Sequence, residues 1–120
     1  MIRVCLVDDQ NLVRQGIRSL LELVDDIEVI AEASDGVEAL PAIRESQPDV
    51  VLLDVTLPGM RALEVLDELR RIRAGVKVVI CTAYSRETAM AELGGRRVDG
   101  FIRKPYRSAD LVQLLSQFAA

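Results

Sequence analysis

The chain contains no histidine among its 120 residues. This absence excludes catalytic triads built on histidine, histidine ligands for a metal ion, and a role as a phosphohistidine donor. Any catalysis must therefore use carboxylates, hydroxyls, thiols, lysines or a bound metal ion. The chain also has no glycine-rich phosphate loop after its first apolar run, which argues against a flavin- or nucleotide-binding domain.

Long apolar runs are absent as well, because none approaches the roughly 20 residues needed to span a bilayer. The first residues lack the basic, apolar and small-residue regions of a secretory signal. We therefore expect a cytoplasmic protein with no membrane partner. Cysteine is scarce, and both copies, Cys5 and Cys81, lie inside apolar runs. That placement predicts buried free thiols.

The composition suits one compact domain over residues 1–120, since 50% of the residues are hydrophobic. No internal repeat or low-complexity tract interrupts the chain. The formal net charge of -4 argues against general nucleic-acid binding by this chain.

Short apolar runs alternate with amphipathic stretches along the whole sequence. The runs are rich in β-branched residues and apolar at consecutive positions, which is typical of strands buried on both faces of a parallel sheet. The stretches between them keep one apolar face at helical spacing. Ser108 is expected to cap the last helix, and Pro41 should kink the second unless that helix starts later. The predicted strands are Ile2–Val7, Glu28–Ala33, Val50–Leu53, Lys77–Cys81 and Gly100–Arg103, and the predicted helices are 11–24, 36–46, 62–72, 86–94 and one beginning near 108.

A strand followed by a helix, repeated five times, implies an α/β fold. The expected architecture is a doubly wound sandwich with right-handed crossovers around a parallel sheet. In such sheets, ligands bind outside the carboxyl ends of the strands. The residues directly after each predicted strand are therefore the candidates for a functional site.

Polar side chains of complementary charge stand at the ends of four predicted strands. Asp8 and Asp9 follow the first strand, and Asp54 follows the third. Thr82 follows the fourth strand and Lys104 the fifth. Singly, each residue has an ordinary explanation as a helix cap, a turn residue, a strand-end hydroxyl or a solvated loop lysine. Their combination at one edge of one sheet favours a functional site.

Three carboxylates in one place need a proton or a cation, because two unit charges about 4 Å apart repel by about 4 kcal/mol at an effective dielectric near 20. Oxygen ligands without histidine or a nearby cysteine suit Mg²⁺. A carboxylate beside Mg²⁺ can act as a nucleophile toward phosphorus and form an aspartyl phosphate. Lysine and threonine side chains could then cover the phosphoryl oxygens.

These motifs together resemble the receiver domain of two-component response regulators over essentially the whole chain. LVDDQ resembles the family's acidic pair, LLDVTLPGM its phosphoacceptor loop, CTAY its fourth-strand threonine, and DGFIRKP its fifth-strand aromatic and Lys-Pro. The resemblance implies a flavodoxin-like (βα)5 sandwich with strand order 2-1-3-4-5.

The resemblance also implies a metal site and a phosphoacceptor. Asp54 would take a phosphoryl group from a histidine kinase or a phosphotransfer protein. Asp9, Asp54 and the backbone carbonyl of Thr56 would bind Mg²⁺ directly, and Asp8 would bind it through water. The protein would not be an enzyme beyond accepting and slowly hydrolysing its own phosphoryl group.

The resemblance also implies which residues contact the phosphoryl oxygens and which change conformation on phosphorylation. Thr82 and Lys104 would contact those oxygens, and Thr82 would move toward them. Phe101 matches the family's switch aromatic, and a core-facing strand residue is the alternative interpretation. The surface formed by the fourth helix, fifth strand and fifth helix would then change. A homodimer on phosphorylation and a DNA-binding or kinase output domain outside this chain are further expectations.

Several positions depart from the family pattern. Arg61 and Ala62 replace a small polar residue and a glycine, and Arg61 is expected to be a poor cap for the third helix. Arg96-Arg97 follows Gly94-Gly95, so we expect the fourth helix to end early and leave a loose loop. Residues 96–107 hold five basic residues against one aspartate, either as a solvated edge or as a docking surface for an acidic partner.

Two alternatives to a phosphorylated receiver remain open. One is a receiver-like protein-interaction module that works without phosphate; the presence of all five site residues argues against it, but the altered loops at 61–62 and 94–97 keep it open. The other is a Mg²⁺-dependent phosphatase with an aspartyl nucleophile. A common form of that chemistry has a second aspartate two residues after the first, where this chain has Thr56.

Overall fold

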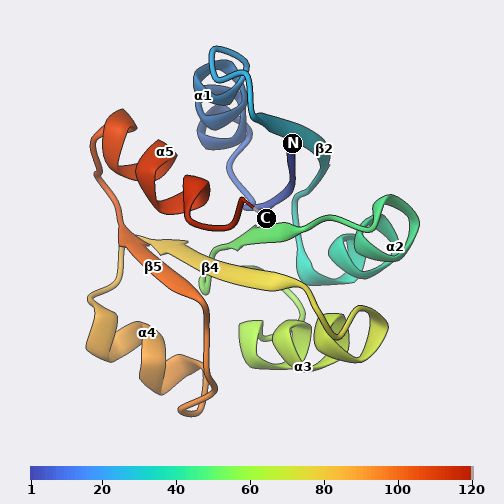
Figure 1. Ribbon diagram of the computed structural model, residues 1–120. Coiled ribbons are helices and arrows are strands. Elements are labelled where there is room, and N and C mark those ends of the chain that lie inside the picture. The colour runs from blue at the N-terminus through green and yellow to red at the C-terminus, as the bar shows by residue number, and fades with distance from the viewer. Residues whose placement is uncertain (120) are drawn as a thin grey trace.

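The computed structural model of the protein describes residues 1–119 and shows a central parallel sheet with helices on both faces (Figure 1). Its five strands are β1 (Ile2–Val7), β2 (Ile27–Ala33), β3 (Val50–Leu53), β4 (Lys77–Thr82) and β5 (Gly100–Arg103). They lie in the order β2-β1-β3-β4-β5, so the predicted doubly wound α/β fold is confirmed. Two predicted bounds move by one residue: β2 begins at Ile27, and β4 includes Thr82.

A helix follows each strand, as the apolar spacing predicts. The first helix ends three residues earlier than expected and the fourth two residues earlier. Pro41 lies inside the second helix, where its missing N–H leaves one helical carbonyl without a donor. The helices are α1 (Asn11–Leu21), α2 (Gly36–Ser46), α3 (Ala62–Ile72), α4 (Arg86–Glu92) and α5 (Ser108–Ser116).

The core consists of two apolar layers, one on each face of the sheet. Helices α1 and α5 cover one face, and α2, α3 and α4 cover the other (Figure 1). Alternate strand residues serve opposite layers: Val4 and Leu6 pack under α1 and α5, while Cys5 and Val7 pack under the other three helices. Burial on both faces explains why the strands are apolar at consecutive positions.

Both thiols are free and buried, as predicted. Cys5 belongs to the layer under α2, α3 and α4, and Cys81 belongs to the layer on the opposite face. No helix within residues 1–119 is long and apolar enough to cross a membrane.

Three expectations about helix starts are tested by the structure. The prediction that Ser108 caps the last helix is wrong, because Ser108 is the first helical residue and Arg107 holds the cap position without a side-chain bond. Arg61 caps α3 poorly, as expected, since its side chain has no acceptor. The Glu64 carboxylate instead accepts a bond from the Arg61 backbone N–H at 3.2 Å. Gln10, rather than either neighbouring aspartate, holds the cap position of α1.

Helix α4 ends early, as the two glycines predict, but the segment that follows it is not a loose loop. Gly94 and Gly95 both have positive φ angles, and the Gly95 N–H donates to the Met90 carbonyl at 3.0 Å, which closes the helix end. The guanidinium of Arg96 then binds both carboxylate oxygens of Asp67 on α3, at 2.7 and 2.9 Å. The expectation of a loose loop is therefore wrong, because this bidentate pair ties the turn to α3.

Candidate functional site

The predicted site residues come together at the carboxyl edge of the sheet, where β1 and β3 lie side by side. Val7 pairs with Leu53, so the residues that follow them start from the same level of the sheet. The Asp54 N–H donates to the Val7 carbonyl at 3.1 Å, and the Asp8 N–H donates to the Ala33 carbonyl at 3.1 Å. Strand register therefore sets the positions of these aspartates.

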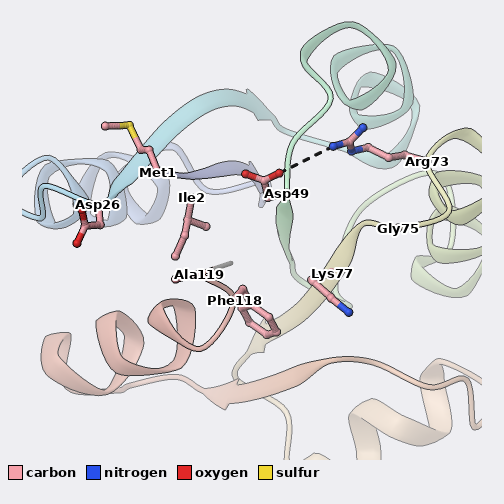
Figure 2. A pocket seen from close by; sticks show the side chains of 9 residues that line it. All are labelled: Met1, Ile2, Asp26, Asp49, Arg73, Gly75, Lys77, Phe118 and Ala119. Carbon is pink, nitrogen blue, oxygen red and sulfur yellow. Dashed lines mark ion pairs between the residues drawn. The ribbon is translucent and has the colours of Figure 1, made fainter.

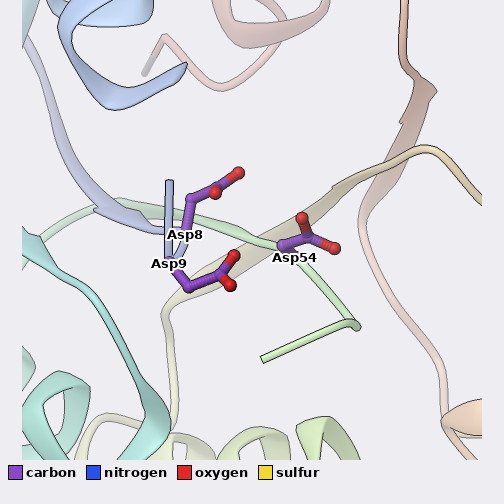
Figure 3. A group of neighbouring side chains, drawn as sticks. All are labelled: Asp8, Asp9 and Asp54. Carbon is purple, nitrogen blue, oxygen red and sulfur yellow. The ribbon is translucent and has the colours of Figure 1, made fainter. Parts of the chain in front are cut away.

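The carboxylates of Asp8, Asp9 and Asp54 converge on one point (Figure 3). One oxygen from each lies within 4.8 Å of the others. Asp8 and Asp54 are each only 5% exposed, whereas Asp9 is exposed. This set of hard oxygen ligands could hold a divalent cation such as Mg²⁺, with the exposed carboxylate on the solvent side.

Lys104 reaches the acidic cluster from β5, across the end of β4. Its Nζ lies 2.6 Å from Asp8 Oδ2 and 3.0 Å from Asp54 Oδ2, and its side chain is only 18% exposed. The interpretation of Lys104 as a solvated loop lysine is therefore wrong. In this structure the ammonium is the counter-charge of the two buried carboxylates.

The protonation states of this pair follow from its contacts. Burial opposes ionisation of Asp54, but the Thr56 backbone N–H and the Lys104 ammonium outweigh it and hold the Asp54 pKa below its ordinary value. Burial also opposes the charge on Lys104, but the hydrogen bonds and charges of Asp8 and Asp54 outweigh it and raise the Lys104 pKa. Asp54 is therefore an ionised carboxylate at neutral pH.

Two threonines lie close to this cluster in different ways. Thr56 donates to Asp54 Oδ1 from its backbone N–H at 3.0 Å and from its hydroxyl at 2.9 Å, so Asp54 is a turn residue as well as a member of the cluster. Thr82 is fully buried at the end of β4, and its hydroxyl accepts a bond from the Tyr84 N–H at 3.4 Å. Within residues 1–119, the Thr82 hydroxyl forms no hydrogen bond to Asp54.

A family model of the response regulator receiver domain matches residues 4–116. The chain belongs to this family. The residues that carry the resemblance stand where the sequence predicts them, because Asp8, Asp9, Asp54 and Lys104 follow β1, β3 and β5 directly and Thr82 ends β4.

Relatives of this receiver domain include both longer and similarly short proteins. The nitrate/nitrite response regulator protein NarL of Escherichia coli (strain K12) is 33% identical over 117 residues, covering 98% of this chain and 54% of that protein. The chemotaxis protein CheY of Halobacterium salinarum is 32% identical, with coverage of 95% and 93%. A solved DNA-binding response regulator of the LuxR family from Staphylococcus aureus superposes with a TM-score of 0.87 at 32% identity, covering 98% of each chain. The receiver domain thus spans about half the length of NarL.

Phe101 on β5 is partly buried in this receiver domain and packs against the layer under α2, α3 and α4. The guanidinium carbon of Arg86, the first residue of α4, lies 5.5 Å from the centre of the Phe101 ring. That distance fits a cation–π contact. The aromatic is thus neither fully in the core nor fully in solvent.

The basic residues after α4 fall into two groups. Arg96 and Lys104 are paired with carboxylates. Arg97, Arg103 and Arg107 are exposed and make no ion pair with any other residue of the described chain. The basic edge of the receiver domain therefore has three arginines without an ion pair rather than five such basic residues, and one of the three, Arg103, donates to the Ala83 carbonyl at 3.3 Å.

A cavity of about 580 Å³ lies where the strands begin (Figure 2), whereas the acidic cluster lies where they end. Asp49 and Arg73 face each other across part of the cavity at 3.9 Å. Its lining comes from residues at or just before the starts of strands and from residues after α5, so it is remote from Asp54 and plays no part in the site. The lining residues are Met1, Ile2, Asp26, Asp49, Arg73, Gly75, Lys77, Phe118 and Ala119.

Arg14 and Glu32 lie beside the acidic pair, but nothing in the sequence pattern singles them out. Arg14 is an arginine on an amphipathic helix, and Glu32 is a glutamate in an apolar strand. Only the register of β2 against β1, which places Glu32 opposite Leu6, brings the two side chains together.

Proposed function

We propose that this receiver domain is a phosphoacceptor in a two-component phosphorelay and that Asp54 takes the phosphoryl group. The observation that carries the proposal is the gathering of Asp8, Asp9, Asp54 and Lys104 at the carboxyl edge of the sheet. Edges of this kind bind ligands in open α/β sheets. A cytoplasmic location and a histidine kinase or phosphotransfer protein as donor belong to the same proposal.

The transfer step requires a nucleophilic carboxylate beside positive charge. An oxygen of Asp54 forms a bond to phosphorus while the phosphorus–nitrogen bond of the donor breaks, and its electron pair stays on the imidazole nitrogen. The lowered pKa of Asp54 keeps the nucleophile ionised. Lys104, already 3.0 Å from Asp54, is placed to stabilise charge on the phosphoryl oxygens.

The metal in this proposal is Mg²⁺, held by Asp9 and Asp54 directly and by Asp8 through water, with the Thr56 carbonyl as a further ligand. Two features support the fit: three carboxylates share one point, and Asp9 is exposed and free of hydrogen bonds within residues 1–119. When bound, Mg²⁺ would neutralise the carboxylates and the transferred oxygens. It would add positive charge to a cluster in which Lys104 contacts two of the three carboxylates, those of Asp8 and Asp54.

The proposed response to phosphorylation is a change in the α4-β5-α5 surface. Thr82 already lies at the end of β4, and its hydroxyl accepts only a long bond of 3.4 Å from the Tyr84 N–H, so little hydrogen bonding would be lost if the hydroxyl turned toward a phosphoryl oxygen. Phe101 is half-buried beside α4, in contact with Arg86. Movement of the loop after Thr82 would shift Arg86 and with it the environment of Phe101.

The output of the receiver domain is proposed to lie outside this chain. The domain acts on its own Asp54 and is therefore regulatory rather than an enzyme with a turned-over substrate. Its relatives include the longer protein NarL and a DNA-binding response regulator of the LuxR family, which favours a DNA-binding output over a kinase. Formation of a homodimer on phosphorylation would couple the receiver domain to that output domain.

The test is phosphorylation by a small-molecule donor. The protein is incubated with acetyl phosphate and Mg²⁺, and intact mass is measured for the wild type, for Asp54→Asn and for Asp25→Asn, which alters an exposed aspartate far from the site. We expect one phosphoryl adduct in the wild type and in Asp25→Asn, and none in Asp54→Asn. The adduct should disappear when EDTA replaces Mg²⁺.

Other outcomes would identify the competing hypotheses. No adduct in the wild type, with intact partner binding, would indicate an interaction module that works without phosphate. Steady hydrolysis of an added phosphomonoester would indicate a phosphatase. An adduct that persists in Asp54→Asn would move the acceptor to another residue.

A further inference from the structure

Asp9 is the least constrained member of the acidic cluster. Asp8 accepts bonds from the Gln10 N–H at 2.9 Å and from Lys104, and Asp54 accepts bonds from Thr56 and Lys104. Within residues 1–119, no hydrogen bond reaches the carboxylate of Asp9. The direction in which this carboxylate leaves the chain is therefore set by its backbone.

The backbone before Asp9 is held by Arg14. One terminal nitrogen of the Arg14 guanidinium donates to the carbonyl oxygen of Asp8, and the other donates to the Asn11 side chain. The Asp8 carbonyl belongs to the peptide plane that joins Asp8 to Asp9, so holding that oxygen fixes the plane. Fixing the plane in turn fixes where the Asp9 side chain begins.

Arg14 is itself held in place by β2. Its Nε donates to Glu32 Oε1 at 3.0 Å, and the two side chains are only 13% and 20% exposed. The turn between β1 and α1 has no alternative support from a helix cap, because the Gln10 side chain makes no capping bond. One guanidinium thus links the turn, α1 and β2.

We propose that Arg14 is a positioning residue for Asp9, braced by Glu32, and that it thereby sets the affinity of the acidic cluster for Mg²⁺. The inference rests on the proposed function, because it assigns Asp9 as a direct metal ligand. The inference goes beyond the proposed function by adding Arg14, a residue that would contact neither the metal nor the phosphoryl group.

The sign of the effect separates positioning from simple electrostatics. Arg14 is a cation close to a cation site, so the loss of its charge alone should tighten Mg²⁺ binding. The loss of a positioning contact should weaken binding instead, and removal of groups that orient metal ligands typically costs about 10- to 100-fold in affinity. Arg18 is a matched control, since it also contacts Glu32 from α1 but makes no bond to the Asp8 carbonyl.

The experiment measures Mg²⁺ dissociation constants by calorimetry for the wild type, Arg14→Gln, Arg14→Lys and Arg18→Gln, with urea unfolding to confirm that each variant is folded. We expect Arg14→Gln to bind Mg²⁺ about tenfold more weakly. Arg14→Lys should also bind more weakly, because an ammonium keeps the charge but cannot form the forked contact. Arg18→Gln should match the wild type or bind slightly more tightly. Amide exchange at Asp9 in EDTA should speed up only in the Arg14 variants.

Three results would overturn the inference. The first is that Arg14→Gln binds Mg²⁺ as tightly as Arg18→Gln. The second is that Arg14→Lys has the Mg²⁺ affinity of the wild type and an unchanged rate of amide exchange at Asp9. The third is that the wild type itself does not bind Mg²⁺. If Arg14→Gln does not fold, the Arg14→Lys comparison alone decides. Failure of the wild type to bind Mg²⁺ would refute the metal site of the proposed function and this inference together, which distinguishes it from failure in the variants alone.

Discussion

Lys104 can be tested as the counter-charge of the metal-free site by changing it to methionine, which keeps a long unbranched side chain without the charge. The change leaves two carboxylates, Asp8 and Asp54, each 5% exposed, without their shared ammonium. Two unit charges 4 Å apart attract by about 4 kcal/mol at an effective dielectric near 20. Both contacts here are shorter than that, at 2.6 and 3.0 Å.

Desolvation offsets part of this attraction, so the net stabilisation is smaller than the Coulomb energy. Removal of one partner from a buried ion pair typically costs about 3 to 5 kcal/mol, because the remaining charge stays buried without compensation. Lys104 keeps 18% exposure, which lets water screen the site, so we expect a loss near the lower end, about 3 kcal/mol in the free energy of unfolding. The deficit should shrink as pH falls, because the Asp54 carboxylate, whose pKa Lys104 would no longer lower, can then take up a proton.

Urea unfolding at pH 7 in EDTA measures the effect. Lys77→Met is the matched control, because Lys77 is the only other lysine and its side chain is exposed at the start of β4. We expect Lys77→Met to change stability by less than about 0.5 kcal/mol. Mg²⁺ at 100 times its dissociation constant should restore about 2.7 kcal/mol to Lys104→Met, since a ligand of the folded state stabilises it by mass action.

The reasoning fails if Lys104→Met is as stable as Lys77→Met in EDTA at pH 7. It also fails if Mg²⁺ leaves the stability of Lys104→Met unchanged while it stabilises the wild type. The first result would mean that the carboxylates need no counter-ion, and the second that the cation does not replace the lost ammonium as their counter-charge.

Two further predictions concern the acids and the thiols. Asp9→Ala should weaken Mg²⁺ binding more than Asp8→Ala in calorimetric titrations, since Asp9 is the proposed direct ligand; equal losses would count against that assignment. Burial raises the pKa of Cys5 to about 12 and of Cys81 to about 11, so each folded thiol stays neutral where the unfolded one, with a pKa near 8.5, ionises. The contribution of the neutral thiols to the free energy of unfolding is therefore fully present below about pH 8.5. It falls as pH rises toward the folded pKa, by about 1 kcal/mol per thiol between pH 8.5 and 9.5. Urea unfolding of a variant with both cysteines changed to alanine should show a shallower pH slope than the wild type, and an equally steep slope would contradict the prediction.

The sequence predicts the sheet and its site well because both depend on strand patterns. Val50–Leu53 can hardly be anything but a doubly buried strand, so the position of Asp54 at its end follows directly. Once five such strands form a parallel sheet, their carboxyl ends share one edge, which brings Lys104 to Asp8 from almost the other end of the chain.

The helix ends are harder to predict because long-range contacts decide them. Ser108 is a good capping residue by type, yet the chain enters α5 one residue earlier, where Arg107 takes the cap position. Two glycines beside two arginines suggest a loose loop. The Arg96 side chain, however, forms an ion pair with Asp67, which lies 29 residues earlier on a different helix. No local pattern indicates that pairing.

This division between strand ends and helix ends bears on how the receiver domain works. The groups proposed for phosphoryl acceptance all stand at strand ends, where backbone bonds such as Asp54 to Val7 fix them. The departures from the family pattern stand at helix ends, at Arg61 and in residues 94–97, and none of them contacts the acidic cluster. The proposed acceptance of the phosphoryl group should therefore be preserved, whereas the proposed change at α4 would have to accommodate the bidentate pair of Arg96 with Asp67. A phosphoryl group on Asp54 would add negative charge and compete with Asp8 for the Lys104 ammonium. The change in charge would therefore begin at the strand ends, whereas the contacts that oppose a movement of α4 lie at helix ends.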